Sequence, residues 1–282
     1  VRRRRESAAR PDVHPLIAET GGYFEGAREL DGGYLRPGKR LVVDVFVTEE
    51  LRERALKLAS EFYLALEDRG YRVAIAPNGR ELFCKELRTR EDGGTTRYYE
   101  KMWRPERPTV AFIGTIAFGL SIFELNAESY TRYEAGKYVK MRVHGPNEPH
   151  YSLGISKRGM PTGRLCIRAY SPYSVVTWER EWRETEDGGL SRKLGSIAEE
   201  LEQEAPTIVK LHEEGEKQAE VHRKEAEAEY KKWQREYQEE RLAEATKKSQ
   251  EDLLSVIDAW GQAKRIEGFF KDAERRSKKL PA

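Results

Sequence analysis

The sequence predicts an α+β fold: an antiparallel sheet with one strand–helix–strand unit, followed by a long C-terminal helical hairpin or coiled-coil arm. Runs of β-branched and aromatic residues separated by turn residues fill much of the first two thirds of the chain, whereas the segment from about residue 190 to 248 is charged and almost free of Gly and Pro. With 282 residues, 38% of them hydrophobic and 35% charged, the chain can bury one core and still carry a solvated helix. We therefore expect a basic, loop-rich segment (1–40), an α+β body (41–189) and a helical arm (190–282).

The strand–helix–strand unit opens the body. Residues 41–47 form a β-branched run of strand length, and Thr48 is typical of a helix N-cap. Apolar residues at three- and four-residue steps over 51–66 predict one buried helix face, which Gly70 ends. Residues 71–76 predict the strand that follows.

Shorter strand-like segments come next, and several of them alternate apolar and polar residues. This alternation predicts an antiparallel sheet with one solvated face, against which the helix packs on the other side. The expected strands are 82–87, 98–103, 109–113, 116–125, 138–143, 151–155 and 164–169.

The arm has two parts. Apolar residues at helical spacing over 190–211 predict a face that docks on the body, and Pro206 predicts a kink or a new helix start. Beyond them, Tyr230, Trp233 and Tyr237 form a heptad-type seam on an otherwise charged helix.

A turn and a final helix are expected to complete the arm. Ser249 and Asp252 resemble a capping box, and the more apolar segment after them includes Trp260. Large aromatic side chains left in water cost on the order of 1.5–3 kcal/mol each. The seam therefore needs a partner helix, which is either this last segment folded back as a hairpin or a second copy in a homo-oligomer.

Catalytic and cofactor motifs are missing from the sequence. No Gly-rich phosphate loop, nucleophile elbow or zinc motif occurs, so we expect no cofactor and no metal. Cys84 and Cys166 have no CxxC or Cys/His spacing, which favours buried free thiols. With no signal peptide and no run of 18 apolar residues, we expect a cytoplasmic protein without a membrane partner.

Several stretches resemble one family in order along the chain: residues 38–47, 54–56, 66–71, 161–165 and 260–269. The family comprises poorly characterised bacterial proteins, often encoded on plasmids and genomic islands. In it a helix-turn-helix segment precedes the same body and arm, so the resemblance implies DNA binding and no defined catalytic residues. Because the chain opens on a run of arginines without a methionine, we expect a further segment upstream of Val1.

Long cations alternate with aromatic rings in the body, as on sheet surfaces that stack bases and contact phosphates. We expect these residues to form one outward face that binds nucleic acid; the competing interpretation is a solvated face whose neighbouring carboxylates cancel the positive field. The candidate nucleic-acid-binding residues are Arg2, Arg3, Arg4, Arg5, Arg97, Tyr99, Lys101, Trp103, Arg104, Arg132, Lys137, Lys140, Arg142, Lys157, Arg158 and Arg164.

These observations favour binding over catalysis. The expected function is a DNA-associated, non-enzymatic binding and oligomerisation module of a bacterial regulator or mobile-element defence protein. One alternative is a metal-dependent nuclease, since Asp44 on one strand with Glu81 and Lys85 on another loosely imitates an acid–acid–lysine site. Another is a protein-binding scaffold that uses the arm.

Overall fold

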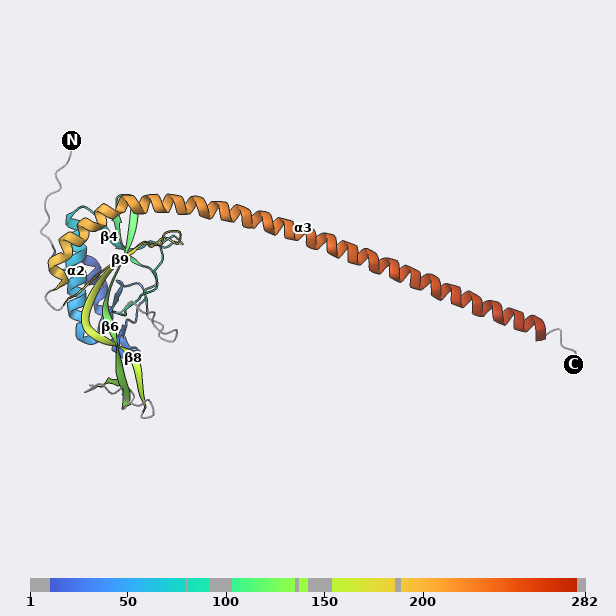
Figure 1. The fold of residues 1–282 in the computed structure, drawn as a ribbon, viewed down its shortest axis with the longest axis horizontal. Helices are drawn as coiled ribbons and strands as arrows, with labels where there is room; N and C mark the ends of the chain where they lie inside the picture. The colour runs from blue at the N-terminus through green and yellow to red at the C-terminus, as the bar shows by residue number, and fades with distance from the viewer. Residues whose placement is uncertain are drawn as a thin grey trace, which may run out of the picture. The chain divides into compact units, whose positions relative to one another are not determined.

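The computed structural model describes residues 11–79, 81–91, 103–134, 137–141, 154–185 and 189–277 (Figure 1). It confirms the α+β class: strands of a mainly antiparallel sheet precede one long C-terminal helix, α3 (Leu194–Ser277). Two helices precede the sheet's main strands, α1 (Pro15–Thr20) and α2 (Arg52–Asp68). The strands are β1 (Arg28–Glu29), β2 (Leu35–Arg36), β3 (Val45–Phe46), β4 (Arg72–Ile75), β5 (Thr109–Ile113), β6 (Ile116–Glu134), β7 (Lys137–Lys140), β8 (Ile155–Tyr170) and β9 (Glu179–Arg183).

Over the described residues, the main sheet has seven strands in the order β4-β5-β6-β8-β9, with β3 and β7 also paired to β6. The pairing is antiparallel except between β3 and β6. The longest register joins β6 to β8, which pair from Gly119 with Tyr170 to Arg132 with Ile155. The sheet is thus organised around one long pair of strands.

The expected strands agree with this sheet to different degrees. The prediction for 109–113 is confirmed, and 71–76 contains β4. Residues 151–155 and 164–169 were expected as separate strands, but Ile155–Tyr170 is one strand.

Two other strand predictions are wrong or only partly right. Only Val45–Phe46 of the run 41–47 pairs as a strand, although Val42 and Val43 are buried. Residues 82–87 are irregular, and 98–103 falls almost entirely outside the described residues.

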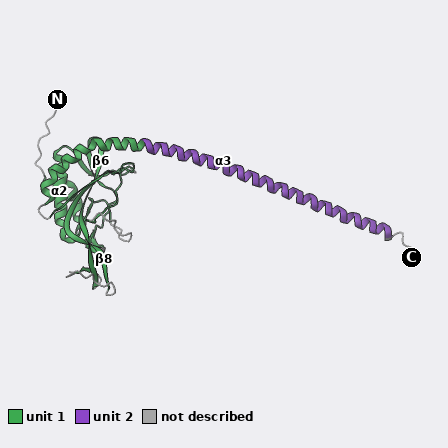
Figure 2. Cartoon of the chain, viewed as in Figure 1, with its two compact units in different colours: residues 1–216 green, residues 217–282 purple. Residues whose placement is uncertain are grey.

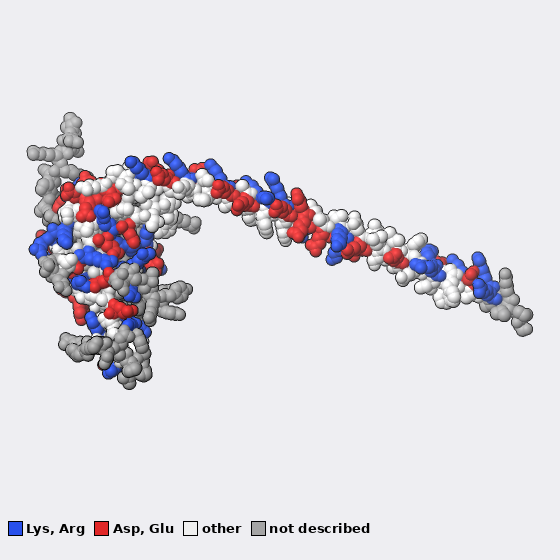
Figure 3. Space-filling model, viewed as in Figure 1, with Lys and Arg blue, Asp and Glu red and all other residues white. Residues whose placement is uncertain are grey.

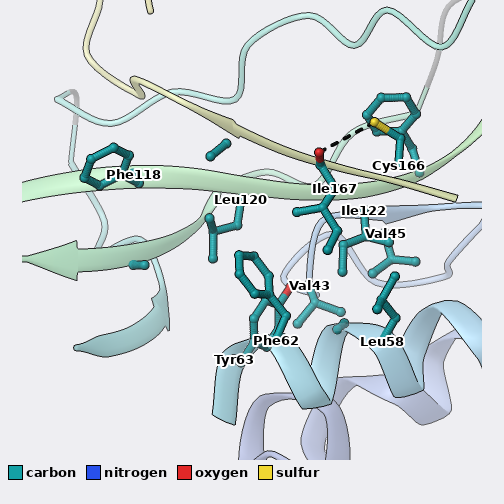
Figure 4. Packing of buried hydrophobic residues seen from close by; sticks show 14 of the residues in the cluster. Val43, Val45, Leu58, Phe62, Tyr63, Phe118, Leu120, Ile122, Cys166 and Ile167 are labelled. Carbon is teal, nitrogen blue, oxygen red and sulfur yellow. Dashed lines mark hydrogen bonds between the residues drawn. The ribbon is translucent and has the colours of Figure 1, made fainter. Parts of the chain in front are cut away.

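Helix α2 packs one face against the sheet, as its apolar spacing predicts. Figure 4 shows Leu58 and Phe62 of α2 pointing towards Leu120 and Ile122 of β6, and all four are buried. Gly70 adopts φ +87° just after the helix, which favours glycine and ends the helix as expected.

The first turns of α3 also belong to the body. Leu194, Ile197, Leu201 and Ile208 are buried in the core, which confirms the docking face. The two compact units divide after Glu216 (Figure 2), so residues 190–216 lie with the body and not with the rest of the expected arm.

The helix does not stop at Pro206, so of the two expected outcomes, a kink or a new helix start, the new start does not occur. An internal proline loses one hydrogen bond and costs about 3 kcal/mol or more. Ala205 and Ile208 are buried on either side of it. Packing against the body therefore holds the helix through the proline.

The predicted hairpin is absent, because α3 continues through Ser249 and Asp252 to Ser277. Ion pairs at helical spacing, such as Glu227 with Lys231 at 2.7 Å, support the helix on its exposed surface. The segment from 216 to 260 also contains no Gly or Pro that would end it. None of the described helices is long and apolar enough to cross a membrane.

We predict that Gly119→Ala destabilises the body. A Cβ at Gly119 would lie 2.4 Å from Cζ of the fully buried Tyr170, so the ring or strand must shift at a cost of about 1–3 kcal/mol. Urea unfolding measures the loss. The control is Gly38→Ala, where no atom lies within 4 Å of the added Cβ. Equal stability of wild type and Gly119→Ala would contradict this packing.

Candidate nucleic-acid interface

The strands β6 and β8 continue beyond the core and, with β7, form a three-stranded ribbon: residues 127–134, 137–140 and 155–160. A bulge separates this distal ribbon from the core. Leu125 alone lies between the paired residues of β6, whereas Thr162, Gly163 and Arg164 lie between those of β8. The bulge therefore decides how the ribbon leaves the core.

Side chains satisfy the backbone of the bulge. The buried Glu124 carboxylate accepts hydrogen bonds from the Gly163 amide at 2.9 Å and from the Thr48 hydroxyl at 2.8 Å. Arg54 donates to the Gly163 carbonyl and pairs with the buried Glu184, which accepts from the Leu165 amide at 3.0 Å. Buried polar groups need such partners, so the bulge is held firmly.

One face of the distal ribbon carries two tyrosines and two cations. Directly opposed residues of antiparallel strands share a face, and the register places Tyr133 with Tyr138, Ser129 with Arg158, and Thr131 with both Lys140 and Ser156. We call Tyr133, Tyr138, Lys140 and Arg158 the tyrosine face. It holds no carboxylate among the described residues of these three strands.

The rings and the guanidinium of this face contact each other. The centroids of Tyr133 and Tyr138 are 4.9 Å apart, and Arg158 Cζ lies 3.5 Å from the Tyr138 centroid. Tyr133 is 58% exposed and Lys140 is also exposed, whereas Thr131 is fully buried. A guanidinium on a ring keeps its N–H edges available to an anion.

The opposite face of the ribbon mixes cations with carboxylates. Lys157 lies over Tyr130, and Arg132 pairs with Glu134 at 3.6 Å. In the strand register Lys137 is opposite Glu134. This face therefore fits the competing interpretation, a solvated face whose carboxylates cancel the positive field of its cations. Figure 3 shows that both signs of charge are also interspersed over the visible side of the body.

The expected single basic face is therefore wrong for the described candidates. Trp103 is buried in the core, Arg104 pairs with Asp44 inside the body, and Arg164 pairs with Glu91. The remaining candidates are divided between the two faces of the ribbon: Lys140 and Arg158 on the tyrosine face, and Arg132, Lys137 and Lys157 at positions of the opposite face. Other candidates lie outside the described residues: Arg2, Arg3, Arg4, Arg5, Arg97, Tyr99, Lys101 and Arg142.

The nuclease candidates do not assemble a metal site. Asp44 is 1% exposed, and its Oδ2 accepts from Arg104 Nη2 at 2.5 Å and from Ser121 Oγ at 2.7 Å. Lys85 donates to the Val176 carbonyl at 2.5 Å, and Glu81 is exposed on an irregular segment. No cluster of three His, Cys, Asp or Glu side chains suited to a metal occurs within the described ranges.

The two cysteines are free thiols, as expected. Burial, and after it the Asp44 carboxylate, raises the pKa of the Cys84 thiol to about 12. Burial likewise raises the pKa of Cys166. Neither thiol is therefore a ready nucleophile near neutral pH.

The aromatic seam of the second unit is intact but uncovered within the described chain. Tyr230, Trp233 and Tyr237 stack along α3, with centroids 6.0 Å and 5.4 Å apart in turn, and each ring is about half exposed. Trp260 is 65% exposed and sits in the same continuous helix. At about 100° per residue it lies on another side of that helix from the seam.

Comparison with known proteins identifies no relative: no protein-family model, no curated protein and no solved structure matches the chain. The functional argument therefore depends on the geometry of the chain itself.

We predict that Asp44 is a structural residue. Asp44→Asn leaves the Arg104 charge buried without its carboxylate, which costs about 3–5 kcal/mol. Chemical denaturation measures the loss, and Glu81→Gln at an exposed position is the matched control. Unchanged stability of Asp44→Asn would mean that this ion pair does not hold the body together.

We also predict slow alkylation of Cys84 in the folded protein. With its pKa raised from 9.0 to about 12, its thiolate fraction at pH 8 falls by about a thousandfold, and reactivity rises as pH approaches 12. Mass spectrometry after brief iodoacetamide treatment, with and without urea, measures each cysteine. Equal rates in folded and unfolded protein would contradict the burial of this thiol.

Proposed function

We propose that this protein is a DNA-associated, non-enzymatic nucleic-acid-binding module whose tyrosine face contacts a single strand. The observation that carries the proposal is the separation of charge on the distal ribbon. One face holds Lys140 and Arg158 beside two tyrosines, and the carboxylates among the described residues of the ribbon, Glu128 and Glu134, belong to the other face.

The chemistry of the tyrosine face fits an unpaired strand better than a duplex. An exposed ring such as Tyr133 offers a surface on which any base can stack, worth about 1–3 kcal/mol per base. Bases inside a duplex are already stacked and do not offer that contact. Lys140 and Arg158 supply the cations for neighbouring phosphates, and the Tyr138 ring fixes the Arg158 guanidinium in advance.

The rigid bulge supports this role. Glu124 and Arg54 bind the backbone at Gly163, so the ribbon is joined to the core through satisfied hydrogen bonds. A binding surface on paired strands loses less conformational freedom on contact than one on a loop. The sequence resemblance adds an expected setting, namely a cytoplasmic regulator or defence factor of mobile elements with a helix-turn-helix before this body.

We predict that substitutions on the tyrosine face weaken binding to a mixed-sequence single-stranded DNA oligonucleotide. Tyr133→Ala removes an exposed stacking ring and should weaken binding by about 5- to 150-fold. Lys140→Ala with Arg158→Ala removes two phosphate contacts and should make the negative slope of log affinity against log salt shallower by about 1.4. Fluorescence anisotropy at several salt concentrations measures both effects.

Arg132→Ala is the matched control, because it removes a cation from the same ribbon but from the opposite face, where Glu134 already pairs with it. It should leave affinity and salt slope nearly unchanged. Circular dichroism checks that all variants fold. The proposal fails if the wild-type chain does not bind single-stranded DNA at low salt, or if Arg132→Ala weakens binding as much as the tyrosine-face variants do.

A further inference from the structure

A second surface, independent of the proposed function, lies on the second unit. Along residues 219–273 of α3, one row of side chains recurs at steps of three and four residues and stays on one side of the helix at about 100° per residue. The row begins and ends at Ala219 and Ala273, and we call it the pairing row. Its residues are exposed throughout.

The pairing row has three parts with different chemistry. Its first part contains the stacked rings of Tyr230, Trp233 and Tyr237. Its middle part contains alternating charges, and its last part contains uncharged side chains, which are small or polar at first and become large and apolar at Ile266 and Phe269. The middle residues are Arg241, Glu244, Lys248 and Glu251, and the later ones include Ser255, Ala259 and Gln262.

The four middle charges make no ion pair within the described part of the chain. Elsewhere on the same helix, charges at similar spacing do pair: Glu220 with Lys224 at 2.7 Å, and Glu267 with Lys264 at 2.9 Å. The middle charges therefore remain available to a partner. Their order along the helix is positive, negative, positive, negative. A second copy running antiparallel presents the reverse order, so each charge meets one of opposite sign.

We propose that two copies of this chain pair antiparallel through the pairing row, about a two-fold axis level with Thr246. In this register Arg241 faces Glu251 of the second copy, and Glu244 faces Lys248 of the second copy. Each of these contacts occurs twice because the axis relates them. Moving the register by one step of the row would bring like charges together, so the charges fix the alignment.

The same register places each ring of the seam opposite a smaller side chain, and towards the ends of the row it places Ala226 opposite Ile266 and Arg223 opposite Phe269. Trp233 faces Ala259 of the second copy, Tyr237 faces its Ser255, and Tyr230 faces its Gln262. Large residues opposite small ones let two helices interdigitate and remove the aromatic rings from water. A parallel pair would instead place each ring against its own copy and each of the four charges against a like charge.

The spacing of the row also predicts the form of the pair. Its average step is close to the 3.6 residues of an undistorted α-helix, so the two helices run nearly straight instead of forming a left-handed supercoil. At a rise of 1.5 Å per residue the contact extends over roughly 80 Å. Leu253, Ile257 and Trp260 lie on the other side of the helix and take no part in it.

Charge reversal in the full chain tests the proposal. Glu244→Lys places the new lysine against Lys248 of the other copy, and Lys248→Glu places the new carboxylate against Glu244 of the other copy. Each repulsive contact occurs twice in the pair. Each variant alone should therefore self-associate at least about tenfold more weakly than wild type. An equimolar mixture of the two variants should recover wild-type association, because every facing pair is again of opposite charge. The double variant should recover it without mixing. Sedimentation over a concentration series measures all four.

The matched controls are Glu220→Lys and Lys224→Glu, which break an ion pair on the same helix away from the pairing row. They should leave association unchanged, and circular dichroism should show equal helix content in all variants. The proposal is overturned if wild type remains monomeric at its solubility limit, or if mixing the two variants fails to restore association.

Cross-linking tests the orientation. Tyr237→Cys and Ser255→Cys chains should form a disulfide-linked dimer when mixed under mild oxidation, and neither should do so alone, because each cysteine faces the other position. A parallel pair would give the reverse result, with each variant linking to itself, and would overturn the proposal. Wild type under the same oxidation gives the background from Cys84 and Cys166.

Discussion

The pairing of β6 with β8 is the constraint on which the rest of the body depends. These strands supply the buried centre of the sheet, with Leu120, Ile122 and Ile167 among its core residues, and then continue as the distal ribbon. Between the two regions Glu124 binds the irregular backbone and Thr48 at once. A carboxylate buried without partners would be costly. The hydrogen bonds of Glu124 therefore join the bulge, the sheet and the segment that precedes α2 in one polar cluster.

The Asp44–Arg104 pair shows how a polar cluster inside a fold can resemble a catalytic site in the sequence. An acid on a strand, with a lysine and another acid further along, is the minimum pattern of a metal site. In the structure the acid is buried against an arginine and a serine, and Lys85 donates to a backbone carbonyl. The sequence pattern does not show which of these side chains are buried. Burial decides whether such an acid has a structural role or a catalytic one.

The parts of the fold that depend on local spacing could be predicted, and those that depend on distant partners could not. Helix α2 and strand β5 follow from periodicity, turn residues and a helix stop at Gly70. The irregular backbone at 82–87 could not be foreseen, because that segment packs beside Pro172 and Arg104 instead of entering the sheet ladder. The absence of a turn at Ser249 could not be foreseen either. A capping-box pattern within a long run of good helix formers does not by itself break the helix.

The candidate site was visible in part. Alternating cations and rings marked the right strands, but the division of the cations between two faces depends on the register of β6 with β7 and β8. That register follows from the length of the bulge. Deleting one of the residues that β8 holds between Pro161 and Leu165 would turn Lys157 towards the tyrosines and Arg158 away from them. The number of residues in the bulge thus decides which face of the ribbon each cation occupies. A deletion of one codon there would redistribute charge between the two faces without changing any charged residue.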